Sequence, residues 1–568
     1  MQINAINNSV IKHRNNQKNQ DNTPPSFKGE GGLLMSLSKP LQKFDANPIL
    51  GVIFLDVISA IAPNTIIDTI DRNPVQGFET FRRESSGLVI NCLLPGLLVG
   101  VAAWAAKGAV LGDEFKELNA HRIYAGKDTI EASADIWKKT SANKSKEEQL
   151  KEFIHMSFDE RIKPNSQSKM ALELDKTQIT KQKNDAVDEL AKAIIESSKN
   201  KNGKFGIENK TLNDLHQKLA TIYGQSKGLE VKKADGKTFT TGMKNYIRDT
   251  YALGKTFMNE KVNHSNIDNL ASKLKKLNRV KSIITMAGVG TLALSMQAIN
   301  RKITEKTSGR KGYSGYKDLS VSNEDLEENK KKLSVGKLLS SAWFASLAFV
   351  SMGRPNKSTW DFAAPTTTMN QARTLSLATD VGRVNAADDK NELKDTTARD
   401  TVIFMNLYVL GDYVQKGVVE LAQKLHKNKT GEDLNLMNEA QKINKDDNIF
   451  KKMGKWIKGK SIKSFEEIEG TTTKENAKNL LLRKKIVTGA NLAGIGYSLV
   501  ALGIFTPIMI AKMTNKNREK QLAKMNITPP PAAQDDSKKS GTIAPKSTST
   551  KTEDGDKKTA TLFGNFKN

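Results

Sequence analysis

The sequence predicts an all-α protein that combines a multi-pass helical membrane domain with a helical hydrophilic domain and has disordered termini. Three observations support this fold class. Hydrophobic residues make up only 38% of the 568-residue chain, yet many of them gather in five runs. Proline is absent between Pro164 and Pro355 and between Pro365 and Pro507, so long helices are permitted there. Both ends are too polar to bury the apolar surface that an ordered fold requires.

Changes in composition along the chain predict seven segments. They are a disordered N-terminal segment at 1–47, a first hydrophobic helical hairpin at 48–112, a hydrophilic helical domain at 113–282, a second hydrophobic helical hairpin at 283–352, a polar loop with amphipathic helices at 353–485, a transmembrane helix at 486–511 and a disordered basic tail at 512–568. Residues 1–32 hold no apolar core typical of a cleavable signal peptide, so an internal segment is expected to direct insertion. The location expected is the cytoplasmic membrane of a bacterium.

The apolar runs decide how many helices are expected in the membrane. They are Pro48 to Pro63, Gly87 to Ala106, Ile283 to Ile299, Leu338 to Met352 and Ile486 to Ala511. A helix needs about 20 predominantly apolar residues to cross a bilayer, and about 17 is the lower limit. The second and fifth runs meet this length, and the third is borderline. The first is short, and the fourth is long enough only with Lys337 or Arg354, so about four helices are expected to span or insert deeply.

Small residues and basic flanks favour lipid over a soluble core. The glycines that we expect at helix crossings are Gly96, Gly100, Gly288, Gly290, Gly494 and Gly496. Basic clusters at 273–281 and 483–485 precede the third and fifth runs, where they can reach lipid headgroups. Basic residues divide evenly between the two sides, so the orientation stays undetermined. The alternative is a buried hairpin, rich in glycine and alanine, in a soluble protein.

The hydrophilic part is typical of soluble helices. Apolar faces at helical spacing occur at 187–195, 212–222 and 267–277. Gly224 ends the second of these, and Asp235-Gly236 can turn a small hairpin. Ser265 with Asp268 resembles a capping box, and the face that follows leads directly into the third apolar run, which predicts one long helix.

The region after the fourth run is expected to begin without regular structure. Residues 353–400 are polar, so an irregular connection of unusual length is predicted there. An amphipathic helix follows, with its apolar face running from Ile403 to Leu425, and it should dock against other helices rather than span.

No catalytic, metal or cofactor site is predicted. Cys92 is the single cysteine, which excludes disulfides and multi-cysteine metal sites. None of the six histidines has a metal-ligand partner at the usual spacing, and the motifs HExxH and GxSxG are missing. Gly288, Gly290 and Ala293 fit GxGxxA, but they lie inside an expected helix with no preceding strand. We therefore expect no enzyme.

Two basic segments are candidates for contact with lipid headgroups or phosphate. The residues concerned are Arg310 and Lys311 in the loop 309–317, and Lys451, Lys452, Lys455, Trp456 and Lys458 in the segment 450–463. The alternatives are a flexible interhelical connection that carries interfacial tyrosines for the first, and a solvated basic linker for the second.

Three polar residues lie inside the apolar runs: Asp56, Asn91 and Asn491. An ionisable group within a membrane is a functional hypothesis by default, so Asp56 is a candidate for an ion or proton path. The interpretation that we favour is that Asp56 caps a neighbouring helix, because its run is short.

The net charge of +27 reflects 73 lysines and only 16 arginines, and arginine is the residue favoured for contacts to nucleic acid. Nucleic acid is therefore an unlikely partner. The expected partners are the lipid bilayer with anionic headgroups, and another protein or a second copy of the chain. The function expected is that of a membrane-anchored helical scaffold without catalytic activity. The alternatives are a transporter or pore and a membrane-inserting or membrane-deforming protein.

Overall fold

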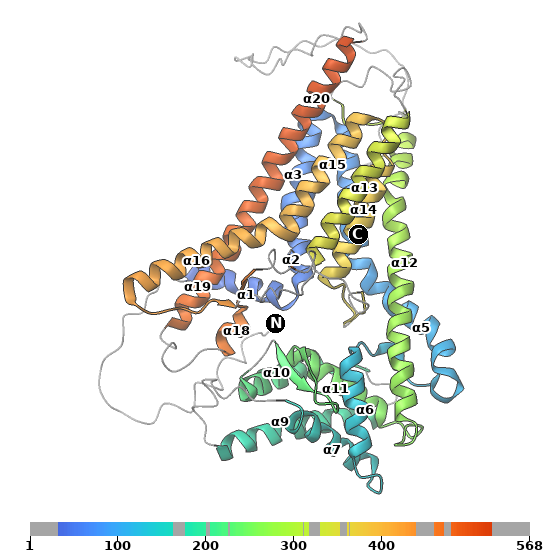
Figure 1. The fold of residues 1–568 in the computed structure, drawn as a ribbon, viewed down its shortest axis with the longest axis vertical. Helices are drawn as coiled ribbons and strands as arrows, with labels where there is room; N and C mark the ends of the chain where they lie inside the picture. The colour runs from blue at the N-terminus through green and yellow to red at the C-terminus, as the bar shows by residue number, and fades with distance from the viewer. Residues whose placement is uncertain are drawn as a thin grey trace, which may run out of the picture. The chain divides into compact units, whose positions relative to one another are not determined.

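The protein is mostly helical, as the sequence predicts. The computed structural model describes residues 32–162, 176–199, 205–224, 228–309, 312–316, 330–352, 360–362, 364–438, 452, 459–470 and 479–524 (Figure 1). The strands in these residues form two short antiparallel pairs, β1 (Leu229–Lys232) with β2 (Thr238–Thr241) and β3 (Met437–Asn438) with β4 (Ser461–Ile462).

The N-terminal third forms two long helices that contain π-helical turns. Their segments are α2 (Pro48–Leu55), η1 (Asp56–Ile61), α3 (Ala62–Ile67) and η2 (Asp68–Arg72), then α4 (Pro74–Leu88), η3 (Val89–Leu93) and α5 (Leu94–Phe115). The first helix passes Pro63, where the sequence predicts the end of an apolar run. The π-helical turn η1 directly precedes α3, and the wider π geometry relieves the clash of the proline ring with the preceding turn. This stretch is therefore longer than expected.

The hydrophilic helices enclose the largest apolar core. They are η4 (Ala120–Arg122), α6 (Lys127–Lys139), α7 (Lys146–Asp159), α9 (Lys176–Lys199), α10 (Asn209–Tyr223), α11 (Met243–Phe257) and the start of α12 (Ile267–Ser308). The expected hairpin forms between β1 and β2 with Gly236 at a φ of 79°, and Gly224 ends α10 at a φ of 67°. Trp137, Phe153 and Phe257 pack together at the centre of this core.

Helix α12 joins the hydrophilic helices to the apolar ones, so the structure does not set the former apart as a separate domain. Its first turns belong to the large core, whereas Val289 and Ala293 pack with Ile90 and Leu375 in the apolar bundle. All described residues through Arg518 belong to one compact unit. The single long helix is confirmed, but its N-cap is Asn266, and the backbone N–H groups of Ser265 and Asn266 donate to the side chain of Asn263.

The expectation of an irregular region at 353–400 is wrong from residue 369 onward, where two helices form. The helices of this half are α13 (Lys330–Met352), α14 (Met369–Asn385), α15 (Lys390–Met405), η6 (Asn406–Leu410), α16 (Gly411–Thr430), α18 (Phe465–Gly470), α19 (Leu480–Ser498), η8 (Leu499–Phe505) and α20 (Thr506–Lys524). Thr368 and Gln371 form a capping box at α14, and Asp389 caps α15. These helices bury polar side chains that pair with one another, so the apolar periodicity that would reveal them is missing.

The apolar face predicted for 403–425 is also partly wrong. Leu421 and Leu425 are exposed on α16, whereas Val419 and the aliphatic part of Lys416 are buried against the neighbouring helices. Helix α16 packs against α19, which agrees with the expected docking.

The predicted disordered ends fall mainly on residues outside those described, which are 1–31 and 525–568. Within the described part, residues 32–46 form helix α1 (Gly32–Ala46), and residues 512–524 belong to α20. Helix α1 is ordered because it packs on α19 and buries Leu41 there.

Apolar side chains cover the outside of the long helices. Among the described residues, five helices are long and apolar enough to cross a membrane: Ile49–Arg72, Pro74–Phe115, Ile267–Ser308, Lys331–Met352 and Leu480–Ala523. In each of them no more than 39% of the most apolar stretch is buried inside the protein. Ile70, Leu97, Ile283, Leu338 and Phe505 are among the exposed apolar residues. The polar residues that are buried lie on the inner faces of the same helices.

Candidate functional site: a buried charged cavity

Four charged side chains form a closed ring of ion pairs, the quartet, inside the bundle. Arg72 lies 3.0 Å from Asp68 and 2.8 Å from Asp395, and Arg399 lies 3.1 Å from Asp68 and 3.7 Å from Asp395. All four side chains are at most 4% exposed. Because two cations alternate with two anions, the quartet is neutral as a whole, which is the condition for burying charge at tolerable cost.

The loop at 312–316 closes the quartet from one side. The Tyr313 hydroxyl accepts a hydrogen bond from Arg72 and donates one to Asp395. The side-chain amide of Asn73 donates to the carbonyls of Ser314 and Tyr316 at 2.8 and 2.9 Å. Tyr313 and Tyr316 are therefore buried anchors and not the interfacial tyrosines of the sequence-based alternative.

A second charged group surrounds Arg383 on α14. Its guanidinium lies 2.9 Å from Asp400 on α15 and 3.1 Å from Glu84 on α4. Arg83 holds the other oxygen of Glu84 at 2.8 Å. A Cβ at Gly87 would lie 3.3 Å from the Arg383 guanidinium, so a glycine there allows the arginine to approach α4.

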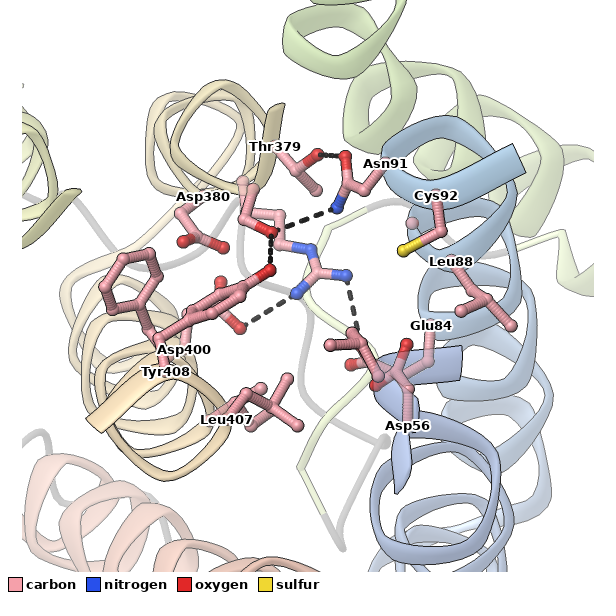
Figure 2. A pocket seen from close by; sticks show the side chains of 16 residues that line it. Asp56, Glu84, Leu88, Asn91, Cys92, Thr379, Asp380, Asp400, Leu407 and Tyr408 are labelled. Carbon is pink, nitrogen blue, oxygen red and sulfur yellow. Dashed lines mark hydrogen bonds and ion pairs between the residues drawn. The ribbon is translucent and has the colours of Figure 1, made fainter. Parts of the chain in front are cut away.

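These charges border a small cavity, which Figure 2 shows. The space in it that is open to the centres of water molecules is about 50 Å³, enough for a few waters. Four helical stretches line it with residues at helical spacing. The charged and polar lining residues are Asp56 from η1, Glu84, Asn91 and Cys92 from α4 and η3, Ser376, Thr379, Asp380 and Arg383 from α14, and Asp400 and Tyr408 from α15 and η6.

Three of these four helical stretches have a π-helical turn at the cavity. Asp56 begins η1, Asn91 and Cys92 lie in η3, and Tyr408 lies in η6. A π-helical turn changes the direction of the side chains that follow it, and such turns are frequent at functional sites. The turns therefore aim residues from three separate segments at one point.

The cavity holds more negative than positive charge. Its lining contains four carboxylates, Asp56, Glu84, Asp380 and Asp400, against the single guanidinium of Arg383. Within the described chain, Asp56 and Asp380 make no ion pair or hydrogen bond. One oxygen of Asp400, Oδ2, is also buried without a partner. Arg83 is not a lining residue, but it pairs with Glu84. When its charge is included, the four carboxylates still outnumber the two guanidinium groups by two.

Neutral polar groups occupy another side of the cavity. The Thr379 hydroxyl donates to Asn91 Oδ1 at 3.0 Å, and the hydroxyls of Ser376 and Tyr408 lie 3.1 Å apart. Cys92 is buried on the same wall, as expected for a packing residue. No group of three or more histidine, cysteine or acidic side chains among the described residues is placed to hold a metal ion.

Of the three polar residues predicted inside the apolar runs, two line the cavity and one does not. Asp56 lines the cavity in the middle of a continuous helix, so it does not cap a neighbouring helix as the favoured interpretation holds. Asn91 lines the same cavity and is hydrogen-bonded, whereas Asn491 on α19 is partly buried and is not among the lining residues.

The predicted glycines divide into three groups. A Cβ at Gly96 would lie 2.8 Å from the Pro365 carbonyl oxygen, and one at Gly494 would lie 2.6 Å from the Gln415 side chain, so both permit close approach. At Gly100 the nearest atom is 3.9 Å away, which is ordinary contact. At Gly288, Gly290 and Gly496, an added Cβ would have no described neighbour within 4 Å outside its own stretch of helix. Gly288 and Gly496 are exposed and Gly290 is half-buried, and none of the three marks a close helix crossing among the described residues.

The candidate lipid contacts are mostly outside the described residues. This holds for Arg310, Lys311, Lys451, Lys455, Trp456 and Lys458. Lys452 is described and is partly buried. Their contact with lipid stays a prediction.

Apart from Asp56, sequence reasoning missed the charged residues that build the site. One signal was present: eight of the 16 arginines are buried among the described residues, compared with three of the 73 lysines. In a lysine-rich chain the rare arginine marks buried ion pairs, because its planar guanidinium can bind two carboxylates at once.

A separate buried acid lies among the hydrophilic helices. Asp249 on α11 lines a second cavity together with Asn278 and Asp361. Burial raises the pKa of Asp249 to about 7, and Arg248 at 3.6 Å offsets this only in part.

No family model, curated protein or solved structure matches the chain.

Proposed function

We propose that this protein is a multi-pass integral membrane protein that acts as a helical scaffold. The observation that carries the proposal is the distribution of polarity: apolar side chains cover the outside of the long helices, and ion pairs fill the inside. A soluble protein has the opposite distribution, because exposed apolar patches of this extent favour association. Lipid is a suitable environment for such a surface.

The quartet supports a scaffold in particular. It connects the first long helix to α15, and Arg383 connects α4 to α14 and α15. Ion pairs between helices in a medium of low dielectric hold the helices in one arrangement. The hydrophilic helices that share α12 with the bundle then form a rigid body that is available to a protein partner.

The outward-facing glycines support self-association. Gly288 is exposed on α12, and Gly290 has no described neighbour within 4 Å. Small residues on a lipid-facing helix let a second helix approach closely. Native mass spectrometry of the purified protein should therefore show a dimer that Gly288→Ile converts to a monomer. A monomeric wild-type protein would contradict self-association.

The membrane proposal can be tested by cysteine labelling, because Cys92 is the single cysteine and is buried. In a Cys92→Ala background, Leu97→Cys and Lys192→Cys place thiols at positions that are 71% and 77% exposed in the structure. In carbonate-washed membranes made permeable to the reagent, a polar maleimide should label Lys192→Cys and spare Leu97→Cys until detergent is added. Equal labelling of both before detergent, or release of the protein by carbonate, would overturn the proposal.

A second candidate function is cation transport, which the excess of carboxylates at the cavity favours. Flux in reconstituted liposomes that Asp56→Asn abolishes would support transport, and no flux in either form would favour the scaffold. The third candidate, membrane deformation, depends on the segment 450–463, which is mostly outside the described residues and stays a prediction.

A further inference from the structure

The cavity beside Arg383 contains a negative charge that the protein does not neutralise. We propose that this cavity binds one monovalent alkali cation between Asp380 on α14 and the unpartnered Oδ2 of Asp400 on α15. The inference depends on the cavity alone and holds whether the protein is a scaffold or a transporter.

The first argument is the state of the two carboxylates. Asp380 is 7% exposed and makes no hydrogen bond or ion pair with any described residue. Asp400 gives Oδ1 to Arg383 at 2.9 Å, which leaves Oδ2 buried without a partner. A buried charge without a partner is strongly unfavourable, so a ligand of opposite charge is expected.

The second argument is that no described cation can fill this role. Arg383 is shared between Asp400 and Glu84 through its two terminal nitrogens, and its buried Nε makes no hydrogen bond, so the arginine attracts Asp380 only from a distance. The charges of Asp380 and Asp400 repel each other. Figure 2 shows the Asp380 and Asp400 side chains on one side of the cavity and Glu84 and Asp56 on the other.

The third argument concerns the kind of cation. Calcium takes six to eight oxygen ligands and magnesium a strict octahedron. No described group of three or more acidic, histidine or cysteine side chains is placed for such an ion. A monovalent cation needs less charge, and the cavity offers two carboxylates and room for a few waters in about 50 Å³. The hydroxyls of Ser376 and Tyr408 on the same lining are further oxygen ligands.

The competing occupant is a proton shared by the carboxylates, as in other close acid pairs. The other titratable or charged groups that face the cavity are Asp56, Glu84, Cys92, Arg383 and Tyr408. If a proton occupies the site, the stability of the protein depends on pH and does not change with the concentration of the alkali cation. The two occupants therefore predict different melting temperatures when the cation is added.

The test measures the melting temperature of the purified full-length protein in detergent at constant ionic strength, in separate series at several fixed pH values. NaCl or KCl replaces N-methylglucamine chloride in steps. We expect a saturable rise in melting temperature with Na⁺ or K⁺, because a ligand that binds only the folded state stabilises it. Asp380→Asn should abolish the rise and should melt above wild type in N-methylglucamine, since it removes the unpaired charge.

Two controls keep the proposal open to refutation. Asp113→Asn removes a carboxylate that is 95% exposed and should leave the cation response unchanged. Equilibrium binding of radiolabelled Na⁺ to the wild-type protein needs no variant, so it decides the matter if Asp380→Asn does not fold. No cation response in the wild type, an unchanged response in Asp380→Asn, or a dependence on pH alone would each overturn the proposal.

Discussion

The quartet makes a quantitative prediction about buried ion pairs. Arg72→Met removes one of its two cations and leaves Asp68 and Asp395 to share Arg399. The variant also removes hydrogen bonds to the Tyr313 hydroxyl and the Gly315 carbonyl. One negative charge then stays buried without a cation.

The magnitude follows from the geometry. For unit charges about 3 Å apart, an effective dielectric of about 20 gives roughly 5 kcal/mol of attraction. Desolvation of the charges offsets much of this attraction, but removal of one partner leaves the other buried and costs about 3–5 kcal/mol. We expect Arg72→Met and Asp395→Asn each to lower the free energy of unfolding by about 3–5 kcal/mol. The double variant is neutral again and should cost about 1–3 kcal/mol less than the sum of the two.

The assay is reversible unfolding of the purified protein in mixed micelles, with the double-mutant cycle measured under one condition. Lys116→Met is the matched control, because Lys116 lies 2.7 Å from Asp113 in an ion pair whose side chains are 53% and 95% exposed. That variant should unfold close to the wild type, since solvent weakens exposed pairs. If Arg72→Met behaves like Lys116→Met, or if the two quartet variants are additive, the assignment of a buried, coupled quartet is wrong.

Three further predictions concern positions outside the quartet. Gly382→Ala places a Cβ 2.4 Å from the carbonyl oxygen of Leu294. Because that oxygen belongs to the backbone and cannot move away easily, overpacking should lower the stability measured by thermal unfolding by about 1–3 kcal/mol. Gly290→Ala is the control, because a Cβ there has no described neighbour within 4 Å, and it should not destabilise the protein. Gly112 has a φ of 68° and a ψ of −179° at a kink in α5, a conformation that is essentially restricted to glycine, so Gly112→Ala should cost about 1–3 kcal/mol in the same assay. Gly108→Ala, before the kink, should be neutral or stabilising. Burial raises the pKa of Asp249 from 3.8 to about 7, so the folded protein keeps a proton that the unfolded chain loses. Wild-type stability should therefore fall from about pH 4 to pH 7, and Asp249→Asn should remove this slope in melting temperatures measured across the range.

Much of the local structure was predictable from residue patterns. The apolar face of 267–277 continues into the third apolar run, and one helix, Ile267–Ser308, follows from that pattern. The Asp235-Gly236 turn and the end of α10 at Gly224 were predictable for the same reason, because a glycine adopts a positive φ at low cost.

Helices α14 and α15 show where this reasoning fails. Their inner faces carry Asp380, Arg383, Asp395, Arg399 and Asp400, which are buried. A pattern method classifies such faces as exposed, since isolated charges avoid apolar surroundings. Thr368 and Asp389 cap these helices in the structure, and cap residues of this kind are a sequence signal that the apolar periodicity does not include.

The amino-acid sequence alone was sufficient for helix content and for the apolar stretches, because both depend on residues that are close together in the chain. The tertiary structure was needed to recognise the quartet and the cavity. Arg72 and Asp395 are 323 residues apart, and Glu84 and Arg383 are 299 residues apart. A charge is tolerated inside the bundle only when its partner arrives from another helix, and no local pattern contains that partner.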